Sequence, residues 1–143
     1  MSTDYLQDLN QEQRRAVTHT DGPLLVVAGA GSGKTRIITY KITHLIKQKL
    51  CQPDQILAVT FTNKAAEEMR KRVEQLLFPL PSIPLISTFH SFGVRVLRRH
   101  ARLLGYQPDF VICDTEDQTR ILKKVYELLG FESGDLPIRE ARS

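Results

Sequence analysis

The sequence has only two cysteines and no apolar run of about 20 residues, the length that a membrane-spanning helix needs. Cys51 and Cys113 lie far apart, and neither belongs to a CxxC pair or a cysteine/histidine cluster. A disulfide framework and a zinc site are therefore both disfavoured. The first ten residues, MSTDYLQDLN, are polar and acidic and lack the apolar core of a secretory signal. These absences predict a cytoplasmic protein with free thiols and no membrane partner.

The composition allows one domain of moderate size and carries little net charge. With 143 residues, of which 41% are hydrophobic, the chain is long enough for one domain or for a piece of a larger one. The 20 lysine and arginine residues exceed the 16 acidic residues, so the net charge is +4. Such a small excess is compatible with a polyanionic partner, although an ordinary solvated surface is the simpler explanation.

Extended and helical patterns alternate along the chain. Short apolar runs predict strands at 24–28, 56–61 and 85–88, and the first of these is expected to be fully buried. Apolar residues at helical spacing follow each predicted strand, and a short amphipathic helix beginning near Asn10 precedes the first strand. This order predicts an α/β fold with a parallel sheet flanked by helices.

Ligands of such sheets bind beyond the carboxyl ends of the strands, which here are Ala28, Phe61 and Thr88. The later run FVIC (110–113) fits either a fourth strand or an extended segment, and a last helix follows it up to Gly130. Past Gly130 the periodicity is lost, and we expect the domain to be incomplete.

The stretch AGAGSGKT lies between the first predicted strand and the following helix. Its glycines allow a tight turn whose backbone N–H groups surround an anion, and the helix N-terminus adds partial positive charge. Lys34 can reach the β- and γ-phosphates of a nucleotide, and the Thr35 hydroxyl can bind Mg²⁺, so these two are the candidate catalytic residues. The residues of this predicted nucleotide site are Ala28, Gly29, Ala30, Gly31, Ser32, Gly33, Lys34 and Thr35.

The nucleotide site has one departure from the usual pattern and one alternative. The pattern GxxxxGK[ST] has glycine where this chain has Ala28, a small residue that should also fit. The alternative is a glycine-rich turn with an incidental lysine, which the strand before it and the helix after it disfavour. A phosphate-binding loop by itself does not define the reaction, since kinases, GTPases, transporters and motors all carry one.

Polar residues also follow the second predicted strand, in the run TFTNK (60–64). Hydroxyls, an amide and a lysine at a helix start suit phosphodiester contacts, and an exposed Phe61 could stack on a base. The structural alternative is that Phe61 belongs to the core and that Thr62 or Asn63 caps the helix.

The turn after the third strand holds Thr88, His90 and Ser91. No serine/aspartate pair or cysteine lies near His90 in the sequence, so a nucleophilic triad is disfavoured. A basic stripe at helical spacing follows: Arg95, Arg98, Arg99 and Arg102. It could lie along a phosphate backbone, form a solvated face, or pair with carboxylates elsewhere.

Gln13 is open to two interpretations. Asn10 followed three residues later by Gln13 resembles a helix-capping arrangement. The functional alternative is that the Gln13 amide reads adenine, because an amide donates and accepts hydrogen bonds at once.

Four segments of the chain share one order and spacing with a known family: LNQEQRRAV (9–17), GPLLVVAGAGSGKTRIIT (22–39), ILAVTFTNKAAEEMRKRV (56–73) and ISTFHSFGVRVLRR (86–99). Together they resemble the start of the UvrD/Rep/PcrA family, superfamily 1 helicases that move 3′ to 5′ on single-stranded DNA. The resemblance covers roughly residues 5–130. The resemblance implies a RecA-like P-loop NTPase fold, with 1–107 as part of ATP-binding domain 1A and 108–143 as the start of the helical subdomain 1B.

The resemblance also implies roles for individual residues. Gln13 would recognise adenine and Arg36 would pack beside it, while Lys34 and Thr35 would bind the triphosphate of ATP and Mg²⁺. Phe61 would stack on a DNA base. The other residues implied to contact DNA are Thr62, Asn63, Lys64, Thr88, His90 and Ser91. In the family, ATP closes a cleft between two RecA-like domains, and the grip on DNA alternates between them.

The family's catalytic carboxylates, its arginine finger and its second RecA-like domain have no counterpart in this sequence. Asp114 and Asp117 follow an apolar run, as the family's catalytic carboxylates do. They more closely resemble the family's stretch that leads into subdomain 1B. We therefore expect a fragment that binds nucleotide weakly and hydrolyses little by itself. The alternatives are a self-contained small P-loop kinase and an inactive nucleic-acid-binding module.

Overall fold

The computed structural model describes residues 4–29, 31–79 and 82–131. Contacts within the chain define two compact units, Met1–Val96 and Leu97–Ser143, which are described one at a time. Helix α4 (Phe89–His100) runs through the boundary between them. The expected boundary at residues 107 and 108 concerns the family's subdomains and stays a prediction.

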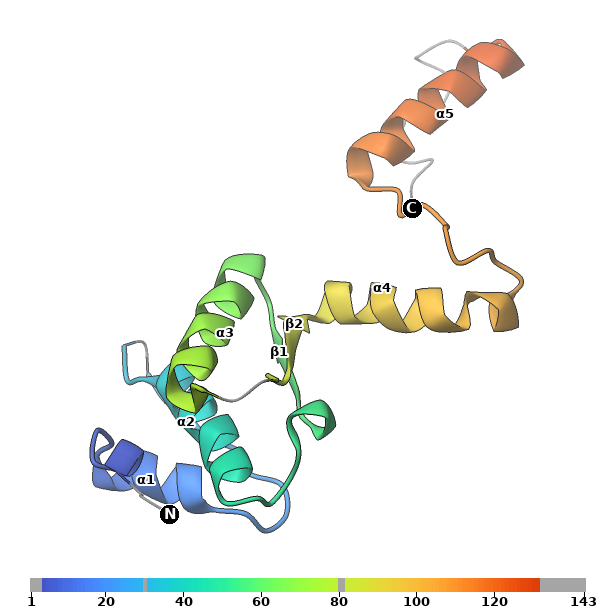
Figure 1. The fold of residues 1–143 in the computed structure, drawn as a ribbon. Helices are drawn as coiled ribbons and strands as arrows, with labels where there is room; N and C mark the ends of the chain where they lie inside the picture. Colours follow the sequence, from blue (N-terminus) through green and yellow to red (C-terminus); the bar gives the residue numbers. More distant parts are fainter. Residues whose placement is uncertain (1–3, 30, 80–81, 132–143) are drawn as a thin grey trace. The chain divides into compact units, whose positions relative to one another are not determined.

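The first unit contains a small parallel sheet. Strand β1 (Leu57–Thr60) pairs in parallel with β2 (Leu85–Thr88), and Thr60 lies opposite Thr88. Helix α3 (Asn63–Leu77) connects the two strands, and α2 (Lys34–Lys47) packs against α3 (Figure 1). The short helix η2 (Pro53–Gln55) leads into β1. This part of the chain confirms the expected α/β alternation and the parallel strand direction.

Apolar side chains from both helices and both strands meet in one buried cluster. Those of α3 are spaced three and four residues apart, as expected for a helix that buries one face. The cluster consists of Ile42, Ile46, Ala58, Ala66, Met69, Val73, Leu77 and Ile86. Because removing this apolar surface from water favours folding, the cluster holds the sheet against the helices.

The N-terminal residues pack on the other side of α2, through η1 (Asp4–Leu6) and α1 (Gln11–Thr18). Helix α1 begins at a capping box. The Gln13 backbone N–H donates to the Asn10 side chain at 2.8 Å, and the Asn10 N–H donates to Gln13 Oε1 at 3.2 Å. The expected cap is therefore confirmed. The apolar residues that join α1 to α2 are Tyr5, Leu6, Leu9, Val17, Ile37 and Tyr40.

A histidine is buried where the N-terminal residues meet α2. The Tyr5 hydroxyl and His44 Nδ1 are 2.9 Å apart, and the Lys47 ammonium lies 4.8 Å from the centre of the Tyr5 ring. Burial and the nearby Lys41 charge both lower the pKa of His44 below 6.5. Neutral His44 can accept the hydrogen bond from Tyr5, whereas protonated His44 cannot.

This pKa shift predicts that acid weakens the attachment of the N-terminal residues. Above pH 6.5 His44 is neutral in both the folded and the unfolded chain, so its contribution to stability is complete. Below that pH the unfolded chain takes up the proton first, and stability falls. Thermal unfolding should therefore show a larger drop in melting temperature between about pH 7.5 and about pH 5.5 for the wild type than for His44→Gln. An equal drop in both proteins would contradict this.

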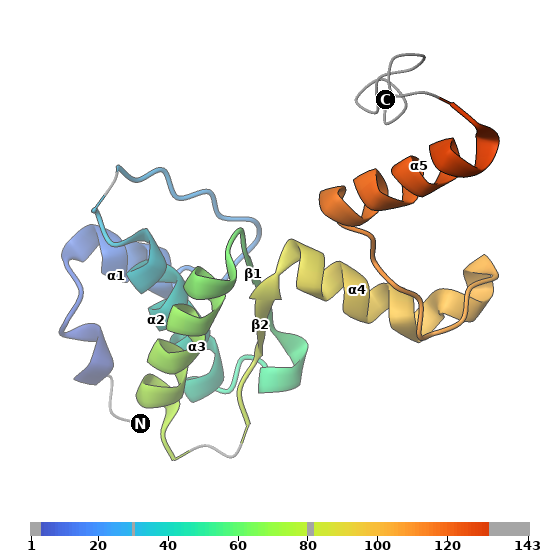
Figure 2. The same ribbon diagram turned by 90° about the horizontal axis from the view of Figure 1, so that it is seen from above.

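The prediction of a buried strand at residues 24–28 is wrong. No strand forms there, and the Leu25 and Val27 side chains are 87% and 89% exposed. In Figure 2 the segment is an unpaired coil between α1 and α2. A strand becomes buried only when strands pair with it and helices cover its faces, and none of the described residues pairs with this segment.

The second unit is helical in its described part. The helix expected over 89–104 is α4 followed by the 3₁₀-helix η3 (Ala101–Leu104), which ends at Gly105. Residues 110–113 form no strand, so the alternative of a fourth strand is wrong. Helix α5 (Thr115–Leu129) ends as expected at Gly130, whose φ of 72° is the left-handed conformation that glycine adopts at helix ends.

Candidate nucleotide and nucleic-acid site

The glycine-rich loop, residues 28–35, leads directly into α2. Gly31 and Gly33 have φ of 76° and 88°, so both adopt the left-handed conformation that only glycine enters at little cost. Gly33 is the N-cap of α2. The Ser32 N–H and hydroxyl both donate to the Gly29 carbonyl, at 3.3 and 2.6 Å. The loop is therefore a tight turn that ends at a helix N-terminus, although Ala30 lies outside the described residues.

The Lys34 side chain folds back over this loop. Its ammonium group donates to the carbonyls of Ala28 at 3.0 Å and Gly29 at 2.6 Å. The charge is thus held against the main chain of the loop, close to the N-terminus of α2. Cation and helix N-terminus together favour an anion here.

Thr35, half-buried at the second position of α2, is the predicted Mg²⁺ ligand. Among the described residues, no group of three or more His, Cys, Asp and Glu side chains could hold a metal ion. Mg²⁺ in nucleotide sites commonly takes only one or two protein ligands, and phosphates and water supply the rest. A single hydroxyl beside a phosphate site fits that requirement.

Gln13 connects α1 to the glycine-rich loop. Its Nε2 donates to the Ser32 carbonyl at 3.2 Å, while its Oε1 serves the α1 cap. A Cβ placed on Gly33 would lie 2.9 Å from the same Nε2. The observed position of the Gln13 side chain therefore requires a residue without a Cβ at position 33. The sequence pattern does not reveal this relation.

Arg36 lies one turn from Tyr40 on α2, and its guanidinium group is 5.4 Å from the centre of the Tyr40 ring. The Tyr40 hydroxyl donates to Asp8 at 2.9 Å. Burial, and then the hydrogen bond with Asp8, raise the pKa of Tyr40. Sequence analysis missed Tyr40, although its spacing four residues after Arg36 placed the two on one helix face.

A cavity of about 580 Å³ lies beside the loop, within the size range of small-molecule sites. It is lined by α1 residues including Asn10 and Gln13, by the segment 24–28, and by Ser32. Of the predicted nucleotide-site residues, the structure brings Gln13, Ala28 and Ser32 to this cavity, whereas Lys34, Thr35 and Arg36 do not line it.

The polar residues after β1 and β2 lie at the same edge of the sheet, because Thr60 and Thr88 are opposite each other. Phe61 is 92% exposed, which excludes the core alternative for this side chain. Its ring centre is 6.2 Å from that of Phe89, at an interplanar angle of 52°. Phe89 is also exposed, so two aromatic rings are available at this edge.

Two of the predicted DNA-contacting threonines serve as helix caps. Thr62 accepts a hydrogen bond from the Ala65 N–H at 3.2 Å, which confirms the capping alternative for this residue. Thr88 is buried and accepts from the Ser91 N–H at 3.2 Å. The remaining predicted contacts are exposed: Asn63, Lys64, His90 and Ser91.

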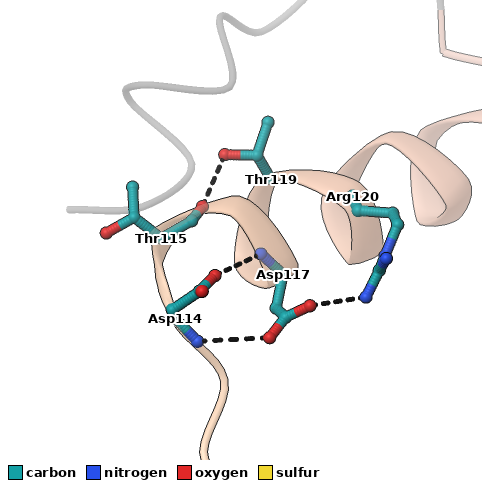
Figure 3. A network of polar contacts seen from close by, with 5 residues as sticks. All are labelled: Asp114, Thr115, Asp117, Thr119 and Arg120. Carbon is teal, nitrogen blue, oxygen red and sulfur yellow. Dashed lines mark hydrogen bonds and ion pairs between the residues drawn. The ribbon is translucent and has the colours of Figure 1, made fainter.

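Asp114 and Asp117 form the capping box of α5 (Figure 3). The Asp117 N–H donates to Asp114 Oδ1 at 2.8 Å, and Asp117 also pairs with Arg120. Both carboxylates therefore stabilise a helix start, as acidic residues do in the first turn. They belong to no group of three or more possible metal ligands among the described residues.

Comparison with known proteins decides the family. Residues 9–142 match the model of the family described as UvrD/REP helicase N-terminal domain. The chain belongs to this family. It is 50% identical over 125 residues to the ATP-dependent DNA helicase PcrA of Bacillus subtilis, which covers 87% of this chain. The corresponding values for PcrA of Staphylococcus epidermidis strain RP62A are 47% over 128 residues and 90%.

The UvrD/REP match concerns one part of much longer proteins. The chain spans only 18% of the Staphylococcus epidermidis helicase and 17% of the Bacillus subtilis helicase. In the part of this chain that the structure describes, no helix is both long and apolar enough to cross a lipid bilayer.

Proposed function

We propose that this chain is the ATP-binding N-terminal part of a DNA helicase that moves 3′ to 5′ on single-stranded DNA in the cytoplasm. The observation that carries the proposal is the glycine-rich loop of residues 28–35, with the Lys34 ammonium folded over it at the start of α2. The similar Staphylococcus and Bacillus proteins are named as ATP-dependent DNA helicases, which supports a RecA-like P-loop domain.

In this proposal the loop holds the triphosphate. Lys34 would exchange its contacts with the Ala28 and Gly29 carbonyls for the phosphate oxygens, where a cation stabilises the charge that develops during hydrolysis. Thr35 would hold Mg²⁺, which neutralises phosphate charge when it is bound. Gln13 and Arg36 would contact the adenine from α1 and α2.

The other side of the site would hold DNA. Phe61 and Phe89 present exposed rings at the shared edge of β1 and β2, and stacking on aromatic rings tolerates any base. Lys64, His90 and Ser91 are exposed beside them and would contact phosphates.

The remaining catalytic groups would come from the rest of a longer protein. The proposal assigns to it the catalytic carboxylates, the arginine finger and the second RecA-like domain. The exposed apolar residues Leu25 and Val27 support this assignment, since a strand of a completed sheet would cover them.

The deciding experiment measures ATP hydrolysis by the full-length protein with and without single-stranded DNA. The proposal requires slow hydrolysis alone and strong stimulation by DNA. Phosphoryl transfer to a small acceptor without DNA would favour a kinase. DNA binding that is indifferent to Lys34→Ala, without any hydrolysis, would favour an inactive binding module.

Phe61→Ala should weaken binding of single-stranded DNA about tenfold, since stacking contributes about 1–3 kcal/mol per base. The comparison is Phe78→Ala, which removes another ring, 84% exposed, at the far end of α3. Fluorescence anisotropy with a labelled oligonucleotide measures both affinities. Equal affinities in the two variants would remove Phe61 from the DNA site.

A further inference from the structure

One segment of the chain is basic without any acidic residue. Residues 89–104, which form α4 and η3, contain four arginines and no acidic residue, so their net charge is +4. The residues before the segment have a net charge of +3 and those after it a net charge of −3. The segment therefore holds the highest density of positive charge in the chain.

The four guanidinium groups are exposed and lack carboxylate partners in the described structure. We call them the α4 arginine face: Arg95, Arg98 and Arg99 of α4, and Arg102 of η3, which follows α4 directly. Within the described ranges the ion pairs involve Lys71, Arg72 and Arg120 instead. Like charges four residues apart, such as Arg95 and Arg99, destabilise a helix. An anion bound along the segment would remove that repulsion.

The arginine face continues from the predicted DNA contacts. Ser91, Arg95 and Arg98 are spaced four and three residues apart, so they share one face of α4. Phe92 and Val96 lie on another face. At about 1.5 Å per residue, Arg99 lies roughly 12 Å along α4 from Ser91. A strand held at Ser91 would find further cations at each following turn.

We propose that the α4 arginine face binds the phosphodiester backbone of nucleic acid. This inference rests on the proposed function and adds a second contact surface to it. A row of charges of one sign fits a polymer with regularly repeated negative charge, and the guanidinium fork can bind a phosphate through two hydrogen bonds. A protein carboxylate partner would be expected on a surface of mixed charge.

The test replaces all four arginines by glutamine in the full-length protein. Binding of a labelled oligonucleotide is measured from about 50 to about 200 mM salt, and log Kd is plotted against log salt concentration. Each lost phosphate contact lowers the slope by about 0.7 for a single strand and about 0.9 for a duplex. We expect a loss of about 2 to 3 in slope on a single strand and at least tenfold weaker binding at low salt.

The matched control removes the same charge elsewhere: Lys71→Gln, Arg72→Gln, Lys123→Gln and Lys124→Gln. Lys71 and Arg72 already pair with Glu67 and Glu68, and α5 carries acidic residues next to its lysines. This control should leave the slope nearly unchanged. Replacing the four arginines by lysine keeps the charge and should restore most of the slope, which separates lost charge from damage to the helix.

The outcomes separate this inference from the proposed function. Wild-type protein that does not bind DNA contradicts the proposed function. If the wild type binds DNA and the glutamine variant keeps the same slope, the proposed role of the α4 arginine face is wrong and the proposed function stands. A lower melting temperature of that variant would then show that the four arginines pair with carboxylates of the protein. A smaller slope of the glutamine variant on single strands, on duplexes or on both supports the inference. It also shows which kind of backbone the α4 arginine face binds.

Discussion

Replacing Lys34 by alanine in the full-length protein should reduce ATP hydrolysis at least about 100-fold, the effect typical of removing a group that stabilises transition-state charge. The ammonium group is the only charge that the described part of the glycine-rich loop carries, and it lies over the carbonyls of Ala28 and Gly29. Without it, the triphosphate would have backbone N–H groups, the helix N-terminus and Mg²⁺, but no cationic side chain from the loop. Nucleotide affinity should fall together with the rate.

The matched control is Lys71→Ala. Lys71 is an exposed lysine of α3 that pairs with Glu67, and ion pairs exposed to solvent contribute little to stability. The Lys71→Ala substitution should leave the rate of ATP hydrolysis unchanged. Thermal unfolding of both variants separates catalysis from folding, and Lys34→Ala should melt within a few degrees of the wild type. Unchanged ATP affinity in folded Lys34→Ala would show that the loop is not a phosphate site.

The elements that the sequence predicted well are those defined by local pattern. Helix α3 follows from apolar residues three and four apart, and α1 begins at the Asn10–Gln13 cap because that cap needs only neighbours in the chain. The parallel direction of β1 and β2 also followed from the helix between them, since such a connection favours parallel strands.

The segment 24–28 shows where such prediction ends. Its apolar run indicates what the residues would do inside a sheet, but burial also depends on strands that the run itself cannot supply. The same limit applies to the site. The sequence proposed Lys34 and Phe61 as candidates, whereas the Gln13 contact with Ser32 and the pairing of Phe61 with Phe89 depend on the three-dimensional arrangement of separate elements.

Gly33→Ala should lower ATP affinity about 30-fold and also reduce the preference for ATP over GTP. Alanine at φ 88° is strained by about 1–3 kcal/mol, which is enough for the loss of affinity if the loop relaxes out of its shape. The added Cβ would also lie 2.9 Å from Gln13 Nε2. Since that amide is the end of a flexible side chain, it should move away and lose its contact with the Ser32 carbonyl.

Gly31→Ala separates the two effects. Gly31 has a similar φ of 76°, but a Cβ there meets nothing within 4 Å. Gly31→Ala should therefore lose affinity for both nucleotides and keep the preference for ATP, whereas Gln13→Ala should lose the preference with an intact loop. Competition binding with ATP and GTP measures all three variants. If Gly33→Ala kept its preference while Gln13→Ala lost it, Gln13 would read adenine without help from the loop; if all three kept it, Gln13 would serve only as the cap of α1.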